Sequence, residues 1–430
     1  MIVNPETAVK LLPVLSVWLI GGCRIKKLLE RSLFTVILLL TLGCFLPALS
    51  VAKVEVTTTI TMPTYGGYYS LAYDSAKDAM FITNVDFDSV FAISDSTHTV
   101  VATAHVGSRP YGIVYDSGMG ELFVANHGAD SVSVISDSTN TVVATIAVES
   151  QPSALAYDSA KGAVFVANYN SNSVSVISDS NNSIVATIPV GNQPCALAYD
   201  SDKGEIFVGH SACNQVLVIS DSTNAVVANI TVEDQPVSLA YDSAKGEIFV
   251  ANYNSSSVSI ISDSTNLVVA TVNVGANPIG LAYDSVDGQV FVANYGSNSV
   301  SVISDSTNAV IATVNLEGPP QGIGYDSGQD EVFVSYSERS TISVISDSPD
   351  ATVSLTPSPS PTSTDPTPTD STTTSPTPSP SVPRFLIWAV ITLIATGTVA
   401  SIIVLAHLSH RRQTCKERMI PQKIKKVAFP

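Results

Sequence analysis

The chain has 430 residues, with 37 Asp and Glu against 20 Lys and Arg, which gives a formal net charge of −17 at pH 7. The charge is unevenly spread, because residues 53–383 hold 34 of the acidic residues and only 7 of the basic ones. A surface this acidic repels the phosphates of DNA and RNA, which excludes nucleic acid as a partner. The remaining basic residues gather near the two ends of the chain.

Residues 1–52 have the features of a secretory signal. Four basic residues precede an apolar stretch at residues 33–49, namely Arg24, Lys26, Lys27 and Arg31. Ser50 and Ala52 then place small residues at the −3 and −1 positions of a cleavage site. Another apolar run, at residues 11–20, is better explained by a start codon assigned too far upstream than by two real segments. Lipoprotein attachment at Cys23 is the alternative.

Seven tandem copies of a 42-residue unit fill the middle of the chain. A Tyr-Asp pair recurs at that step, beginning at Tyr73, Tyr115, Tyr157, Tyr199, Tyr241, Tyr283 and Tyr325. An Ile-Ser-Asp-Ser tetrapeptide keeps the same register in every copy, with no insertion or deletion. A period near 40 residues indicates one supersecondary unit stacked on copies of itself.

Each unit is predicted to contain four short strands. In the third copy, residues 153–157, 163–168, 173–177 and 184–188 are apolar or alternating runs, and turn residues separate them. Seven such meanders bury both of their faces when they are arranged radially. We therefore predict an all-β fold over residues 53–355, a seven-bladed β-propeller of four-stranded antiparallel blades. An open β-solenoid is the competing fold, although its coils are usually shorter than 42 residues.

The strand count also predicts how the ring closes. Six outer strands lie between consecutive units, so a seventh has to come from one end of the chain. Residues 54–62, with the strand near Thr57–Met62, are the favoured candidate, and Ala351–Leu355 is the weaker one. We expect the N-terminal strand to complete the last blade.

The repeat resembles a known family. Residues 164–177, Val-Phe-Val-Ala-Asn-Tyr-Asn-Ser-Asn-Ser-Val-Ser-Val-Ile, followed by Ile184-Val-Ala-Thr-Ile188, resemble the YVTN-type β-propeller repeat. The resemblance covers about residues 54–350, although the Tyr-Val-Thr-Asn string itself is Phe-Val-Ala-Asn in most copies. It implies a propeller of the kind common in surface-layer and other cell-surface proteins of prokaryotes, archaea especially. It implies no particular activity, since propellers have many functions.

The C-terminal part is organised for a membrane. Residues 356–383 contain 9 Pro and 16 Ser or Thr, which predicts an extended stalk, open to O-glycosylation. Residues 384–408 include 24 consecutive uncharged residues, long enough for a single transmembrane helix of about 36 Å. Residues 409–430 form a basic tail. The positive-inside rule places this tail in the cytoplasm and the propeller outside the cell.

The sequence contains no motif typical of catalysis, metal binding or a cofactor. The Ser-Asp-Ser of each unit recurs seven times, which favours a role in capping turns over a role as a nucleophile. Asp86 and Asp88 form an acidic pair, but the Gly and distal Glu of a calcium loop are missing. We therefore predict no catalytic residue, no metal and no cofactor.

The two rims of the predicted ring differ in their sequences. The first-to-second and third-to-fourth turns keep the same residues in all units, and they share one rim, here called the constant rim. The second-to-third turns and the unit-to-unit connections diverge on the opposite, variable rim. A single-ligand site requires broken symmetry, so the candidate binding residues lie here: Asn126, His127, Asn168, Tyr169, His210, Asn252, Tyr253, Asn294, Tyr295 and Tyr336.

Two classes of function fit these features. The favoured one is a single-pass cell-surface module for binding or adhesion, or a structural component of the cell envelope, with extracellular protein or glycan partners. The alternative is an ectoenzyme of lactonase-like type with its site at the central channel. An enzyme needs Glu, Asp, Asn and His to converge there, and His127 and His210 are the histidines so placed.

Two covalent modifications are also predicted. Three sequons mark Asn181, Asn229 and Asn254 as candidate glycosylation sites in the exported part. Cys195 and Cys213 both fall in the fourth unit, near the start of its first strand and just after its second. Antiparallel strands bring these positions together on the variable rim, which predicts a disulfide. Two reduced thiols are the alternative.

Overall fold

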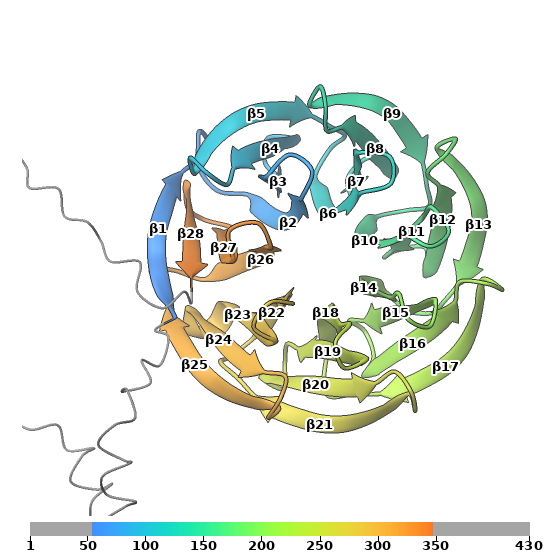
Figure 1. Ribbon diagram of the computed structural model, residues 1–430. Coiled ribbons are helices and arrows are strands. Elements are labelled where there is room, and N and C mark those ends of the chain that lie inside the picture. Colours follow the sequence, from blue (N-terminus) through green and yellow to red (C-terminus); the bar gives the residue numbers. More distant parts are fainter. Residues whose placement is uncertain (1–53, 347–430) are drawn as a thin grey trace, which may run out of the picture. The chain divides into compact units, whose positions relative to one another are not determined.

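A computed structural model describes residues 54–346, which form a ring of seven sheets around a central axis (Figure 1). Each sheet has four antiparallel strands, so the predicted all-β, seven-bladed propeller is confirmed. The predicted signal, stalk, transmembrane helix and basic tail lie outside the described residues, as does the strand candidate at residues 351–355. Within residues 54–346, no helix is long and apolar enough to cross a membrane.

The blades follow the sequence repeat. Blade 1 comprises β2 (Tyr68–Asp74), β3 (Ala79–Asn84), β4 (Ser89–Ser94) and β5 (Thr99–His105), and blade 2 comprises β6 (Pro110–Asp116), β7 (Glu121–Asn126), β8 (Ser131–Ser136) and β9 (Thr141–Ala147). Blade 3 comprises β10 (Pro152–Asp158), β11 (Ala163–Asn168), β12 (Ser173–Ser178) and β13 (Ser183–Pro189), and blade 4 comprises β14 (Pro194–Asp200), β15 (Glu205–His210), β16 (Gln215–Ser220) and β17 (Ala225–Thr231). Blade 5 comprises β18 (Pro236–Asp242), β19 (Glu247–Asn252), β20 (Ser257–Ser262) and β21 (Leu267–Asn273). Blade 6 comprises β22 (Pro278–Asp284), β23 (Gln289–Asn294), the 3-10 helix η1 (Tyr295–Ser297), β24 (Ser299–Ser304) and β25 (Ala309–Asn315). Blade 7 comprises β26 (Pro320–Asp326), β27 (Glu331–Tyr336), β28 (Thr341–Ser346) and the N-terminal β1 (Glu55–Thr61).

The repeated aspartate and serines fold the turns of the constant rim. Asp158 Oδ1, at the end of an inner strand, accepts hydrogen bonds from the backbone N–H groups of Ala160 (3.0 Å) and Lys161 (3.1 Å). In the third-to-fourth turn of the same blade, between β12 and β13, the hydroxyls of Ser178 and Ser180 are hydrogen-bonded at 3.0 Å. The aspartate contacts recur in all the other blades, and the serine contact recurs in blades 1, 2, 4, 5 and 6. This recurrence supports the structural role expected for these residues.

The second and third strands of the blades are buried on both faces. All six residues of β11 are buried, as are the first five of β12. The hydrophobic clusters lie between blades, so that Phe165 of blade 3 packs with Leu197 and Ile206 of blade 4. A sheet with two apolar faces needs a covering layer on each side, which a closed ring supplies to every blade.

Strand β1 closes the ring as predicted. It pairs antiparallel with β28 and takes the outer position of blade 7, with Ile60 opposite Ile342 and Thr61 opposite Thr341. Ile60 and Met62 are buried in a cluster shared with blades 1 and 7. Residues far apart in the chain therefore complete one sheet (Figure 1).

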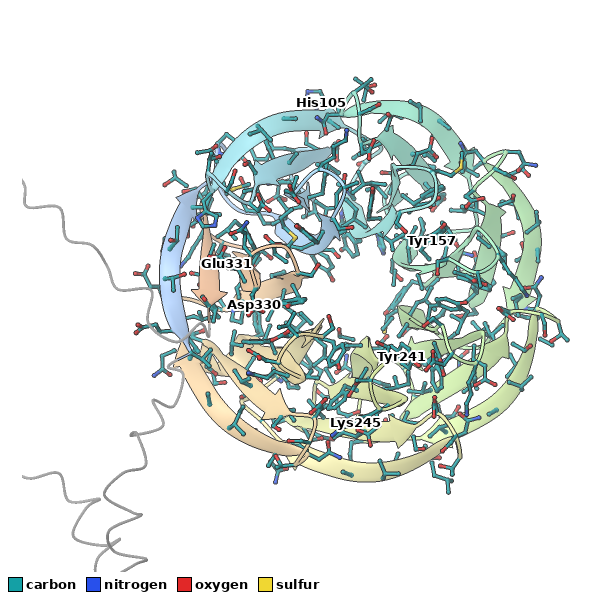
Figure 2. All side chains as sticks on the ribbon, in the orientation of Figure 1. His105, Tyr157, Tyr241, Lys245, Asp330 and Glu331 are labelled. Atoms are coloured by element: carbon teal, nitrogen blue, oxygen red, sulfur yellow. The ribbon has the colours of Figure 1, made fainter. Side chains whose placement is uncertain are left out.

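Polar contacts also join neighbouring blades on the constant rim. Burial, and after it the nearby carboxylate of Asp116 in blade 2, raises the pKa of Tyr157 in blade 3 above its ordinary value. In the same way, burial and then the carboxylate of Asp200 in the preceding blade raise the pKa of Tyr241. Tyr157 and Tyr241 are labelled in Figure 2. These phenols remain protonated at neutral pH and face an acceptor across the blade interface. Three ion pairs add to this contact: Lys161–Asp221 (3.1 Å), Lys203–Asp263 (3.7 Å) and Lys245–Asp305 (3.5 Å).

The closing strand gives a matched pair of substitutions. Ile60→Ala removes a buried side chain and is expected to destabilise the protein by about 2–5 kcal/mol, lowering its melting temperature by several degrees. Thr59→Ala, at the exposed neighbouring position, is expected to have little effect. Thermal unfolding followed by circular dichroism compares the two. Negligible losses in both variants would show that β1 does not occupy blade 7 in solution.

Candidate functional site

A β-bulge in every inner strand builds the centre of the ring. In blade 3, Pro152 pairs with Asn168 and Ala154 with Ala167, which leaves Ser153 without a partner. The inner strands of the other six blades show the same one-residue shift. Bulges re-aim side chains and are frequent next to functional sites. In blades 3 to 6 the bulged residue is the second residue of the inner strand, and in blades 1, 2 and 7 the shift spans the second and third residues. The second residue is called the bulged residue in all seven blades.

The bulged side chains line a cavity of about 700 Å³. This volume lies within the range of roughly 300–1,000 Å³ that is usual for small-ligand pockets. All seven bulged residues contribute: Tyr69, Tyr111, Ser153, Cys195, Val237, Ile279 and Gln321. Two residues further along each strand, an aliphatic ring follows: Leu71, Ile113, Leu155, Leu197, Leu239, Leu281 and Ile323. Loops of the variable rim add Gln151, His127, Tyr169, Ser211, Gln235 and Tyr253 around the mouth.

Aromatic rings form a column on one side of this cavity. Tyr69 and Tyr111 are stacked, with their ring centroids 4.5 Å apart. The other face of Tyr111 is stacked on His127 at 4.2 Å, and Tyr169 follows at 6.5 Å, tilted by 50° from His127. Arg109 Nη2 donates a hydrogen bond of 3.1 Å to the hydroxyl of Tyr111. The column thus runs across blades 1 to 3 and is held in place from the rim.

The cavity is uncharged at neutral pH. None of its lining residues is Asp, Glu, Lys or Arg, although residues 54–346 hold 30 acidic and 6 basic residues. Burial, together with the nearby Arg109, lowers the pKa of His127, so its imidazole is neutral. Burial and the neighbouring Tyr111 raise the pKa of Tyr69 to about 12, so its phenol is protonated.

Backbone hydrogen bonds fix the aromatic residues of the rim loops. His127 N donates to Arg109 O (3.0 Å), and Tyr253 N donates to Gln235 O (2.9 Å). Tyr169 N is bound in the same way at the mouth of the cavity. Of the ten predicted binding residues, His127, Tyr169 and Tyr253 line the cavity. Tyr295 is partly exposed in η1 and is not part of the lining.

Four predicted binding residues are buried, and their side chains have a structural role. They are the asparagines that end the second strands of blades 2, 3, 5 and 6: Asn126, Asn168, Asn252 and Asn294. Asn168 Nδ2 donates hydrogen bonds to the hydroxyls of Ser173 (3.1 Å) and Ser175 (2.9 Å) on the neighbouring strand. The other three make the same two contacts. These amides tie neighbouring strands together within the blade, and a binding role for them stays a prediction.

His210 and Tyr336 occupy the same position in blades 4 and 7 and are also buried. The hydroxyl of Tyr336 is hydrogen-bonded to Ser343 Oγ at 2.7 Å. His210 Nε2 lies 3.0 Å from Val190 O, and the two serine positions opposite it are Gln215 and Leu217. Both side chains take the place of the asparagine within the blade, and a binding role for them stays a prediction.

The predicted disulfide is absent, since Cys195 and Cys213 are both free thiols. The bulge turns Cys195 toward the channel, where its Sγ donates to Gly209 O (3.6 Å) and Pro236 O (3.4 Å). Ser153 makes the equivalent contacts in blade 3. The thiol therefore takes the place of a hydroxyl, and burial raises its pKa to about 12.

The three sequon asparagines are accessible. Asn181 and Asn254 are exposed in turns, and Asn229 is exposed on the outer strand β17. Their glycosylation stays a prediction. Among the described residues, no group of three or more His, Cys, Asp or Glu side chains is arranged to hold a metal ion.

The bulged residues were missed by the sequence reading. Their signal was present, because the Pro before them, the Leu or Ile two residues later and the Tyr-Asp pair hardly change between units. The second position alone varies freely, from Tyr to Ser, Cys, Val, Ile and Gln. The register shift and the cavity that this position lines are seen only in the structure.

Comparisons with known proteins confirm the fold. No protein-family model matches the chain, and no curated protein matches it. Among solved structures, the chain is similar to hydrazine synthase from Kuenenia stuttgartiensis, with a TM-score of 0.59 and 18% identity over 68% of this chain and 98% of that one. Identity this low shows a shared propeller fold and nothing about function.

The His210 position yields a stability prediction. His210→Asn alone is expected to cost about 1–3 kcal/mol, because the buried amide meets Gln215 and Leu217 where blades 2, 3, 5 and 6 offer two serines. The combined variant His210→Asn, Gln215→Ser, Leu217→Ser rebuilds the amide contacts and is expected to recover most of the loss. Urea unfolding measures both, and equal stability of the single and combined variants would contradict the structural role.

The same variants test a pH dependence. Burial lowers the pKa of His210 in the folded state. Its contribution to stability is therefore complete above the unfolded pKa of about 6.5 and declines as the pH falls below that value. The combined variant lacks this histidine and should lose less stability than the wild type between pH 7.5 and pH 5. Identical losses would contradict the assignment.

Proposed function

We propose that the protein is a membrane-anchored cell-surface binding module whose ligand occupies the cavity at the variable rim. The observation that supports this most directly is the broken symmetry of the bulged ring. Its seven positions are equivalent in the fold, yet they carry six different residue types. Positions that serve folding alone, such as the Tyr-Asp pair, are identical in all blades.

The described chain ends fit such an arrangement. Glu55, near the start of β1, pairs with Ser346, the last residue of β28, so both ends lie on the constant rim. The cavity mouth is surrounded by loops of the opposite rim. A propeller tethered through the residues that follow position 346 would present its cavity away from the tether. A stalk at residues 356–383 and a transmembrane helix at residues 384–408 would serve as that tether.

The lining favours binding over the alternative, an ectoenzyme of lactonase-like type. The predicted acid–base groups do not converge, since His210 is buried in its blade and no carboxylate lines the cavity beside His127. A histidine without a carboxylate or a nucleophile in reach is a weak catalyst. Stacked rings and amides are instead well suited to holding a ligand in a fixed position.

The resemblance to YVTN-type repeats supports the same setting. Propellers of that kind are common on prokaryotic cell surfaces, and the export and anchor features of this sequence agree with it. Within this setting the protein would serve in binding, in adhesion or as a structural part of the envelope. Its partners would be extracellular proteins or glycans.

Two equivalent tyrosines test the location of the site. Tyr253 lines the cavity, whereas Tyr295, at the same place in the next unit, does not. The protein is screened by thermal shift against glycans and envelope proteins from the host. Tyr253→Ala is expected to weaken the binding of any hit at least several-fold, and Tyr295→Ala is expected to leave it unchanged. Hits that are lost with Tyr295→Ala and kept with Tyr253→Ala would contradict the proposal.

A further inference from the structure

We propose that the ligand is a neutral oligosaccharide, with its terminal sugar in the cavity and the following sugars over Tyr65 and Phe87 on the variable rim. This inference rests on the proposed function and adds the class of ligand. Three features carry it: the uncharged lining, the stacked rings, and a second aromatic pair outside the cavity.

The uncharged lining selects an uncharged ligand. Moving an ionic group from water into a cavity costs free energy unless a counter-charge receives it, and the lining provides none. Gln151, Gln235 and Gln321 each offer an amide that can both donate and accept hydrogen bonds. Hydroxyl groups also do both, so a ligand rich in hydroxyls matches this set better than a purely apolar one.

The aromatic column limits the shape of the ligand. Both faces of Tyr111 are covered, by Tyr69 and by His127, so a flat aromatic molecule cannot stack on this ring. The side chains of Tyr69, Tyr111 and His127 nevertheless line the cavity. The aliphatic ring beyond them, which includes Leu71 and Leu239, receives apolar C–H groups. A sugar ring presents hydroxyls around its edge and C–H groups on its faces.

Tyr65 and Phe87 extend the aromatic surface out of the cavity. They are 69% and 49% exposed, respectively. Each is the only aromatic residue at its position among the seven units. The positions equivalent to Tyr65 hold Gly or Glu, and those equivalent to Phe87 hold Ala, Ser, Cys or Arg.

The same two residues lie at the entrance of blade 1. The connection that carries Tyr65 leads directly into β2 and the lining residue Tyr69. It packs on the turn that carries Phe87, because Val85 N donates to Gly67 O at 2.8 Å. The two exposed aromatic residues therefore belong to adjoining loops of blade 1, the blade that supplies Tyr69 to the cavity. A chain ligand uses both sets, whereas a single small molecule fills the cavity alone.

A length series tests this inference on the full chain, in a detergent without a sugar headgroup. The probes are oligomers of glucose, mannose and N-acetylglucosamine with one to five units, and uronic acid oligomers serve as charged counterparts. Isothermal titration is expected to show affinity rising with length for one neutral series. Phe87→Ala and Tyr65→Ala should remove about threefold to tenfold of the affinity for the longer oligomers and leave the monosaccharide unchanged.

Two further variants distinguish a failure of the oligosaccharide proposal from a failure of the proposed binding function. Tyr111→Ala should weaken oligomers of every length, and Met119→Ala, an exposed residue of the constant rim, should weaken none. Tighter binding of the charged series, an affinity that does not change with length, or no binding of any neutral series overturns the oligosaccharide. If another ligand is then weakened by Tyr111→Ala, the cavity remains the binding site. If no ligand responds to Tyr111→Ala, the proposed function fails as well.

Discussion

The sheets of this protein are apolar on both faces, and the rest of the structure depends on that constraint. Strand β11 has no exposed residue, so blade 3 is stable only between two neighbours. The same holds for the other blades, and a row of such sheets would leave two apolar faces in water. Closure removes those faces. Strand β1 therefore matters beyond its own contacts, since it completes the seventh blade and joins the two ends of the ring.

Much of this architecture could be predicted because it is repeated. A turn residue such as Asp158 and a core residue such as Phe165 recur at the same step in seven units. Each strand could therefore be predicted from seven copies of its sequence. Ring closure followed from counting strands. The cavity-lining residues at the bulges, such as Ser153 and Cys195, were not predicted. Their position depends on a local register shift of the inner strand, which the strand pattern in the sequence does not show.

The site shows how differences between units can mislead. Asn168 and His210 lie at the ends of variable turns, which predicts binding residues, yet both side chains are buried and hydrogen-bonded within the protein. His210 replaces the asparagine found in five other units, and its partners, Gln215 and Leu217, also differ from serine. Such paired changes indicate repacking. The variation at Tyr69 and Tyr111, in contrast, lies at residues that line the cavity.

The central claim, that one ligand site interrupts an otherwise uniform ring, can be tested directly through the 15 tyrosines of the chain. Fluorine NMR of protein labelled with 3-fluorotyrosine, assigned by single Tyr→Phe substitutions, reports on each ring when the tightest ligand from the screen is added. If one ligand site interrupts the ring, the fluorine resonances of the cavity residues Tyr69, Tyr111, Tyr169 and Tyr253 are expected to shift. The seven tyrosines of the blade interfaces, such as Tyr157, should keep their resonances. Resonance shifts confined to the interface tyrosines or to Tyr295 would contradict a ligand site in the cavity.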